Sequence, residues 1–147
     1  MTLTQNELNN SIGSLVYQAD RHLINRLQRN FQDSGFDITV EQWKVLLNLF
    51  IKDGQNQQEL SELTEKDKTS ITRLVDGLEK RNLAVRIPDR SDRRNKLIYL
   101  TPKGKNMQNE LVYNAEKTLV QALKDISEQD IEICRRVLCV IIENLKS

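Results

Sequence analysis

The sequence has few of the residues on which catalytic and metal sites are usually built. Its 147 residues include one histidine, two cysteines and five glycines. It contains no paired Cys-x-x-Cys, no His-Glu-x-x-His and no glycine-rich phosphate loop, the motifs that hold metals and nucleotides. The many carboxylates are scattered, as is usual for the surface of a soluble protein. We therefore expect no metal, no cofactor and no enzymatic activity.

The scarce cysteines and the single histidine predict little chemistry of their own. Cys134 and Cys139 are five residues apart on one predicted helix, so they lie on different faces and an intrachain disulfide is not expected. Neither lies at a cationic helix start, which favours packing in an interface over redox sensing. His22 lies in a predicted helix with no nucleophile nearby, so we interpret it as a surface or interface residue.

Long hydrophobic runs are also missing. The longest, near residues 45–51, is interrupted by Asn48 and is too short to cross a bilayer. The N-terminus shows no charged-then-apolar signal with a cleavage site, so we expect a cytoplasmic protein. Aromatic residues are only 5% of the chain, but 38% of residues are hydrophobic and 29% are charged. This composition predicts one folded domain rich in helix, with no membrane partner.

The most informative stretch runs from residue 56 to residue 101 and predicts two helices followed by a hairpin. The helices are expected over residues 57–64 and 68–81, with Asn56 and Asp67 as their N-caps. The arms of the hairpin are residues 84–87 and 97–100. The tip between them is too long for a two-residue turn, so it should project as a loop.

The second helix of this stretch has two different faces. Ile71, Leu74, Val75 and Leu78 follow helical spacing and predict a buried stripe. The opposite face carries hydroxyls and charges, namely Thr69, Arg73, Asp76 and Lys80. Such a face can lie in the major groove of DNA. Taken alone, it is more typical of an ordinary solvated helix.

The hairpin arms alternate with period two, which predicts one inward and one outward face. On the first arm, Val85 and Ile87 alternate with Arg86. On the second arm, Ile98 and Leu100 alternate with Tyr99.

Positive charge is concentrated in this part of the chain. Residues 66–96 contain ten lysines and arginines against five acidic residues, whereas the remainder contains twelve basic and sixteen acidic residues. The net charge of +1 therefore hides a basic segment on an acidic body. This asymmetry favours a DNA-binding surface over a simple solvated helix.

Helices are also predicted on both sides of this stretch. One is expected over about residues 5–32, and a second should begin at a capping box of Thr39 and Gln42 and end at Gly54. A third is expected after Thr101, its N-cap, with Pro102 at its first position. Its buried stripe should consist of Met107, Leu111, Ala115, Leu119 and Ala122 or Leu123.

The last predicted helix follows Ser127 and is apolar over more than half of its circumference. A helix at the end of so short a chain has no second core to cover such a face. We therefore expect it to pack on a second copy of the chain. The alternative is a helix fully buried in the chain's own core.

Four runs of the sequence resemble the MarR family of bacterial transcriptional regulators. They are Thr72-Arg73-Leu74-Val75-Asp76, Leu78-Glu79-Lys80-Arg81, Pro88-Asp89-Arg90-Ser91-Asp92-Arg93-Arg94 and Leu100-Thr101-Pro102-Lys103-Gly104. Asn82 departs from the family, which usually has glycine there. Asparagine also tolerates the left-handed conformation, so the departure costs little.

The resemblance implies a mainly α (α+β) winged helix-turn-helix fold. Residues 36–101 would form the DNA-binding lobe, and residues 1–35 and 102–147 a helical dimerisation lobe. It also implies a homodimer that binds a palindromic operator, most often as a repressor. The rival hypothesis is a winged-helix module that binds proteins and has lost DNA binding, which the charge asymmetry and the intact wing arginines argue against.

The residues expected to contact DNA come from the second helix of the motif, from the turn before it and from the wing. They are Lys66, Lys68, Thr69, Ser70, Thr72, Arg73, Arg90, Arg93, Arg94 and Lys96. By the family pattern Arg94 enters the minor groove, and Asp67 or Asp92 pairs with it and fixes its direction. The alternative, compatible with that role, is that both aspartates are cap and turn residues.

The resemblance further implies regulation by a small aromatic effector that binds between the two lobes. Candidate lining residues are Tyr17, His22, Trp43 and Leu47. Aromatic residues at helical spacing are more often part of a core, which is the alternative reading of this set.

Overall fold

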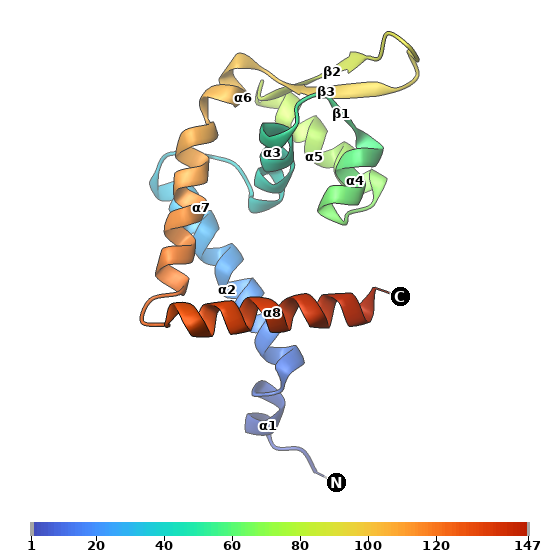
Figure 1. Ribbon diagram of the computed structural model, residues 1–147. Helices are drawn as coiled ribbons and strands as arrows, with labels where there is room; N and C mark the ends of the chain where they lie inside the picture. Colours follow the sequence, from blue (N-terminus) through green and yellow to red (C-terminus); the bar gives the residue numbers. More distant parts are fainter. Residues whose placement is uncertain (1, 147) are drawn as a thin grey trace.

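The computed structural model describes residues 2–146 and shows a helical protein with one small sheet (Figure 1). Its elements are α1 (Gln5–Asn9), α2 (Ile12–Asp33), α3 (Val40–Ile51), β1 (Gln55–Asn56), α4 (Gln57–Thr64), α5 (Lys68–Lys80), β2 (Ala84–Pro88), β3 (Lys96–Leu100), α6 (Pro102–Asn106), α7 (Gln108–Ala122) and α8 (Glu128–Leu145). The predicted fold class, a winged helix-turn-helix with helices before and after it, is confirmed.

Most predicted helix starts are correct, because each depends on a few neighbouring residues. Thr39 with Gln42 and Asn56 with Glu59 both form complete capping boxes. Single side-chain caps are present at Asp67, Thr101 and Ser127. Asn82 has a φ of 58°, so the residue that replaces the usual glycine does adopt the left-handed conformation.

Three predicted helix boundaries are wrong. The first helix is interrupted at Asn10 and Ser11, whose polar side chains bond to backbone groups nearby and compete with a continuous helix. The helix after Thr101 is interrupted at Met107. Helix α3 ends at Ile51 instead of at Gly54. Gly54, with φ at +71°, turns the chain so that its N–H donates to the Ile98 carbonyl (3.0 Å).

The sheet is antiparallel, with strand order β1-β3-β2. The short strand β1 was not predicted, and it pairs Gln55 with Ile98 on the inner strand β3. On the other side β2 pairs with β3 in the register Ala84↔Leu100, Arg86↔Ile98 and Pro88↔Lys96. Together β2, β3 and the loop between them form the wing, which projects from the body (Figure 1).

The core lies among α3, α4, α5 and the sheet and is closed by Phe31 of α2 and Leu111 of α7. Ile71, Val75 and Leu78 of α5 are fully buried, and Leu74 is half-buried at the margin. The predicted stripe of α5 is therefore confirmed. The Trp43 ring contacts Phe31 edge to face, with ring centroids 5.8 Å apart.

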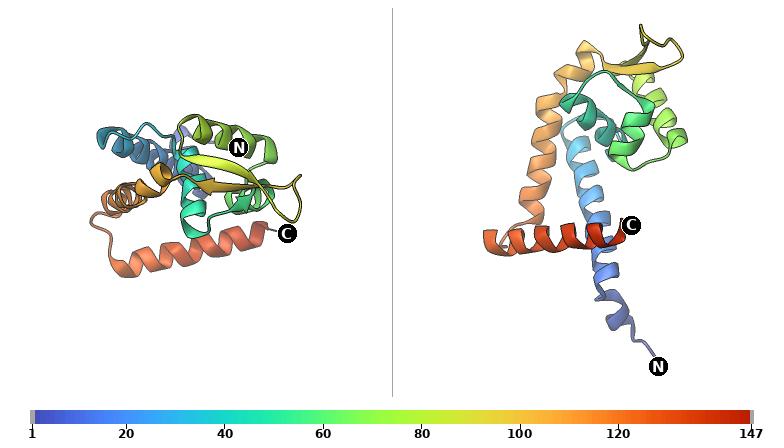
Figure 2. Two further views of the ribbon diagram at one scale, coloured as in Figure 1. Left: turned by 90° about the horizontal axis from the view of Figure 1, so that it is seen from above. Right: turned by 45° about the vertical axis from the view of Figure 1, so that its right-hand side comes forward.

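Helices α2 and α7 lie side by side below the core (Figure 2). A polar seam joins the last turn of α2 to the second half of α7. The Asn30 amide donates to the Thr118 hydroxyl (2.8 Å) and to the Gln121 carbonyl oxygen (3.0 Å). The predicted apolar stripe of α7 is therefore only partly correct. Leu111 is buried, but lower down Asn114 and Thr118 are buried while Leu119 is exposed.

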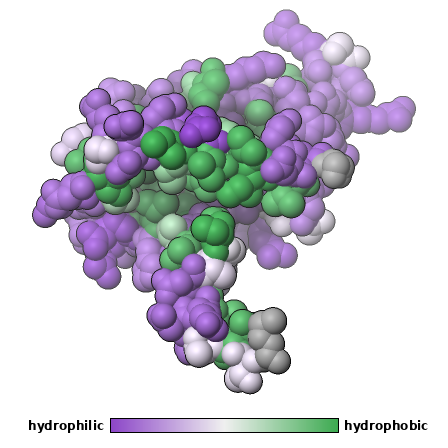
Figure 3. All heavy atoms as spheres, turned by 60° about the horizontal axis from the view of Figure 1, so that its bottom comes forward, coloured by the Kyte–Doolittle hydropathy of each residue, from purple (hydrophilic) through white to green (hydrophobic). Residues whose placement is uncertain are grey.

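Helix α8 crosses in front of α2 and has no buried residue (Figure 1). Apolar side chains gather in a band along it (Figure 3). They include Ile133, Val137, Leu138, Val140, Ile142 and Leu145, which are 40% to 78% exposed. The alternative that α8 is buried in the chain's own core is therefore wrong. Within residues 2–146, no helix has the length and hydropathy needed to span a membrane.

Candidate nucleic-acid interface

The outward face of α5 presents the side chains that the sequence predicts. Lys68, Thr69 and Arg73 are exposed, and in the described part of the chain neither cation forms an ion pair. Thr72 is half-buried and already satisfied, because its hydroxyl accepts from Gln57 Nε2 (2.6 Å) and donates to the Lys68 carbonyl (2.9 Å). Lys68, Thr69 and Arg73 are therefore free to reach a ligand.

The turn before α5 is fixed by two charged residues. Asp67 caps the helix by accepting from the Ser70 N–H (2.7 Å), and this bond holds the pKa of Asp67 below its ordinary value. Lys66 forms an ion pair with Glu41 at the start of α3. Within residues 2–146, Lys66 is thus the one cation predicted to bind DNA whose charge is already paired.

The wing ends in a loop that is closed by its own hydrogen bonds. The Asp89 N–H donates to the Asn95 carbonyl (2.9 Å) at the mouth of the loop, and the Asn95 N–H donates to the Asp92 carbonyl (2.9 Å). The Ser91 N–H and hydroxyl donate to Asp89, which lowers the pKa of that carboxyl. The ordered loop carries Arg90, Arg93 and Arg94, and β3 starts with Lys96. All four are exposed.

The base of the wing meets α4 and α5 at a hollow of about 220 Å³, which we call the wing-root recess. Lys68 of α5 borders it, together with Arg94 and Lys96 of the wing. Asn56, Gln57 and Gln58, at the N-terminus of α4, form its other wall. Three cations from two separate elements therefore face one small space. Arg90 borders a different hollow, with Ile87 and Tyr99.

The predicted ion pair between Arg94 and an aspartate is absent from residues 2–146, and the alternative role of the aspartates is found. Asp67 is the cap of α5. Asp92 accepts a hydrogen bond from the Arg94 backbone N–H (3.1 Å) and so shapes the turn. The guanidinium of Arg94 is left exposed.

Strand β2 has the two alternating faces that the sequence predicts, and its apolar residues lie on the outward face. Val85 and Ile87 are exposed, whereas the Arg86 side chain is only 20% exposed and turns toward α5. It pairs with Asp76 (2.8 Å) and with Glu79, and it donates to the Thr72 carbonyl (3.2 Å). Arg86 therefore contributes no free positive charge to the wing.

The four residues suggested for an effector pocket do not meet. Tyr17 is 68% exposed on α2, while Trp43 lies in the core and Leu47 packs against it. His22 borders a hollow of about 190 Å³ beside Arg26, Thr118 and Gln121. The reading of Trp43 and Leu47 as core residues is the one that the structure supports.

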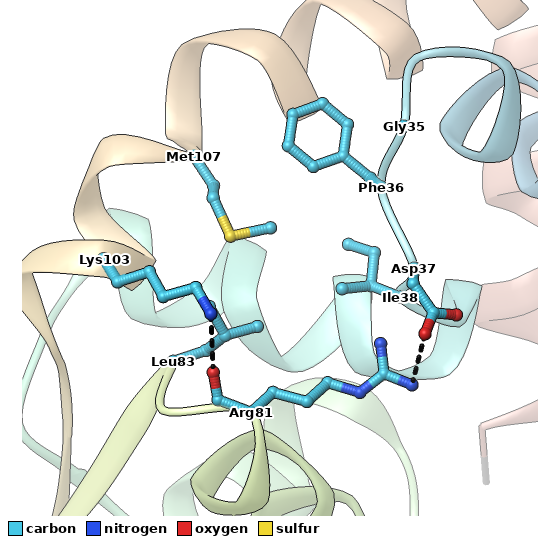
Figure 4. Close-up of a pocket in the computed structure, with 8 residues that line it drawn as sticks. All are labelled: Gly35, Phe36, Asp37, Ile38, Arg81, Leu83, Lys103 and Met107. Carbon is cyan, nitrogen blue, oxygen red and sulfur yellow. Dashed lines mark hydrogen bonds and ion pairs between the residues drawn. The ribbon is translucent and has the colours of Figure 1, made fainter.

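A larger pocket of about 460 Å³ lies where the end of α5 meets α6 and the loop before α3 (Figure 4). Phe36, Ile38, Leu83 and Met107 form its apolar walls. Arg81 and Lys103 lie along one side. Arg81 forms an ion pair with Asp37 (3.6 Å), and Lys103 Nζ donates to the Arg81 carbonyl (3.2 Å).

Sequence reasoning missed Arg86 and the polar residues at the N-terminus of α4. The register of the sheet would have revealed Arg86, because residues opposite each other share a face and Ile98, its partner, faces inward. No sequence pattern points to Gln57, because its hydrogen bond to Thr72 depends on how α4 packs against α5.

Comparison with known proteins identifies the family. The family model described as "MarR family" matches residues 38–96. The multiple antibiotic resistance protein MarR of Salmonella typhimurium is 32% identical over 93 residues, 63% of each chain. The crystal structure of a probable transcriptional regulator from Pseudomonas aeruginosa is 30% identical, with a TM-score of 0.83 over 91% of this chain and 98% of that one.

The structure of the transcriptional repressor CouR bound to a 23-mer DNA duplex shares the fold, with a TM-score of 0.80 over 97% of this chain and 99% of that one. Its sequence is 23% identical. The motif, the wing and these relatives agree, and the chain belongs to the MarR family of transcriptional regulators.

Proposed function

We propose that the protein is a sequence-specific DNA-binding repressor that acts as a homodimer in the bacterial cytoplasm. The observation that carries this proposal is the convergence of Lys68, Arg94 and Lys96 on the wing-root recess. None of the three forms an ion pair within residues 2–146, so their charge is available. A small space lined by cations suits a DNA phosphate, whose counterions are released on binding.

In this proposal α5 lies in the major groove, where Thr69 and Arg73 reach base edges and phosphates. Ser70 and Thr72 lie deeper and support that face. The wing reaches the adjacent minor groove, whose concentrated negative potential attracts arginine. Arg94 enters it by the family pattern, and Arg90, Arg93 and Lys96 face the DNA backbone.

The dimer would be formed by the helices outside the winged lobe, residues 1–35 and 102–147. The exposed apolar band of α8 is the main support, because a face of this kind is normally covered in the functional state. A twofold dimer presents two copies of α5 to a palindromic site. The half-sites would then be about 10 base pairs apart, one turn of the duplex.

The pocket in Figure 4 is our candidate for an effector site in place of the four residues that do not meet. Apolar walls beside Arg81 and Lys103 suit an aromatic carboxylate. Arg81 follows the last residue of α5, so binding there can shift the recognition helix and lower DNA affinity. Benzoate as a probe should raise the melting temperature of the protein and weaken its binding to DNA. Lys103→Met should reduce both effects.

The central test is selection of bound sequences from a random DNA pool, followed by titration of a recovered duplex at several salt concentrations. We expect an inverted repeat and a steep fall in affinity with added salt. The rival hypothesis, a protein-binding winged helix, predicts no enriched sequence and no salt-dependent binding. Enrichment of a single unrepeated half-site would contradict the dimer.

A further inference from the structure

Arg86 joins the wing to the recognition helix by three contacts at once. Its guanidinium pairs with Asp76 (2.8 Å) and Glu79, and donates to the carbonyl of Thr72 (3.2 Å). The three partners span more than one turn of α5. We call Arg86, Asp76 and Glu79 the Arg86 bridge.

The two arms of the wing are attached to the body in different ways. The inner arm β3 pairs with β1, and its Leu100 N–H donates to the Asp53 carboxylate (2.9 Å). The outer arm β2 has no such neighbour on its free edge. Beyond the buried Ala84, Arg86 is the side chain of β2 that turns inward, since Val85 and Ile87 are exposed.

The contact continues from the wing through α5 to α4. Arg86 bonds to the carbonyl of Thr72, and the hydroxyl of the same threonine accepts from Gln57. Gln57 borders the wing-root recess together with Lys68 and Arg94. Arg86 thus lies at one end of a chain of contacts that leads to the space where the free cations gather.

We propose that Arg86 is a positioning residue for DNA binding, which fixes the angle between the wing and α5 so that both fit adjacent grooves at once. It acts without touching DNA, because its guanidinium is held by the two carboxylates and the carbonyl of α5. This inference rests on the proposed function. It adds a residue that neither the charge pattern nor the wing motif assigns.

A second explanation has to be separated from this one. Asp76 is 54% exposed on the outward face of α5, and Glu79 lies one turn further on, so Arg86 also neutralises two carboxylates near DNA phosphates. If neutralisation were its whole effect, removing the carboxylates would strengthen DNA binding. If positioning is its role, removing them breaks the bridge and weakens the contacts made by the wing.

The experiment measures affinity for a duplex recovered by selection, together with a chemical footprint of its major and minor grooves. Arg86→Met should lower affinity about ten-fold, the size typical of residues that act without touching the ligand. Protection of the minor groove should be lost, while protection of the major groove by α5 remains. Arg86→Lys should keep only part of the affinity and of the minor-groove protection, because one ammonium cannot make the several directed hydrogen bonds of the planar guanidinium.

The decisive variant is Asp76→Asn combined with Glu79→Gln, which makes the chain more positive but removes both ion pairs of the bridge. We expect reduced minor-groove protection despite the added charge. The matched control is Glu62→Gln combined with Glu65→Gln, which changes the net charge equally at exposed positions of the same lobe. The control should keep full protection.

The outcomes separate the two proposals. If the wild-type chain binds no duplex at low salt, the proposed function fails. If the wild type binds and the Asp76→Asn, Glu79→Gln variant keeps full minor-groove protection, only the positioning role of Arg86 is overturned. If Arg86→Met does not fold, the Asp76→Asn, Glu79→Gln variant still tests the positioning role. This variant should fold, because both carboxylates are at least one-third exposed and the amides that replace them are nearly equal in size.

Discussion

Helices α5 and α8 are both amphipathic, but they differ in what covers their apolar faces. Ile71, Val75 and Leu78 of α5 are fully buried in the core of the winged lobe. Helix α8 carries at least as many apolar residues and buries none of them. Helical periodicity therefore predicts that an apolar face needs a partner. Whether that partner belongs to the same chain is decided by the fold.

The largest expected effect is on α8. Ile141 is half-buried and lies between Val140 and Ile142 of the apolar band. Ile141→Asp places a charge in the surface that we assign to the dimer interface, and a buried unpaired charge costs about 3–5 kcal/mol. In a twofold dimer the change occurs twice, so association should be abolished. Molar mass in solution, measured by light scattering, should fall to that of one chain or the protein should precipitate.

The control for this change is Glu143→Gln, at an exposed polar position of the same helix. It should leave the molar mass unaltered. A stable, soluble dimer of the Ile141→Asp variant would show that the apolar band of α8 is not the interface.

The second prediction concerns the contrasting helix. Leu78→Ala removes a fully buried side chain from the core, which should destabilise the fold by about 2–5 kcal/mol. Leu138→Ala removes the same group from an exposed position on α8. Its effect should appear only in the dimer and should therefore vary with protein concentration. Urea unfolding of both variants at two protein concentrations tests this difference. If the loss of stability depended on protein concentration equally in both variants, the prediction would be wrong.

The same contrast explains which parts of the fold could be predicted from the sequence. Thr39, Asn56 and Asp67 were identified as caps, because a cap bonds to backbone groups only two or three residues away. The interruption at Asn10 and Ser11 is also local, but several polar residues in a row fit both a helix and a turn. Sequence periodicity alone did not separate the two.

The parts of the site that depend on contacts between distant residues could not be predicted from the sequence. The side of β2 that faces inward depends on its register with β3, and a shift of one residue exchanges the two faces. The alternation Val85-Arg86-Ile87 therefore predicts two faces for this strand, but it does not predict which of them lies inward. Likewise, the charge of Lys68, Arg94 and Lys96 predicts that they are exposed. Their convergence on the wing-root recess depends on how the chain folds and could not be predicted.

The third prediction separates an exposed arginine of the wing from an exposed arginine elsewhere in the chain. Arg94→Ala removes an exposed, unpaired cation and should cost about 1–3 kcal/mol of operator binding without changing the dimer. Arg29→Ala, at an exposed position on α2, is the matched control and should change binding little. Binding titrations and light scattering on the same samples check both parts. Undiminished affinity of an intact Arg94→Ala dimer would remove Arg94 from the interface.

The smallest expected effect is a pH dependence at the turn before α5. The Lys66 ammonium, and to a lesser extent Lys44, holds the pKa of Glu41 below its ordinary value of 4.5, although partial burial opposes this shift. Because the pKa is lower in the folded state, the stabilisation is fully present above that value and is lost as the pH falls below it.

Both partners are partly exposed to solvent, so the loss should stay below about 1 kcal/mol. Urea unfolding of the wild type and of Glu41→Gln at pH 7 and at pH 3.5 measures it. The difference in stability between the two proteins should narrow at the lower pH, because protonated Glu41 and glutamine are both uncharged. A difference that stays constant with pH would mean that packing, and not the charge of Glu41, ties α3 to the turn. The paired Lys66 would then be as free to bind DNA as the unpaired Lys68 beside it.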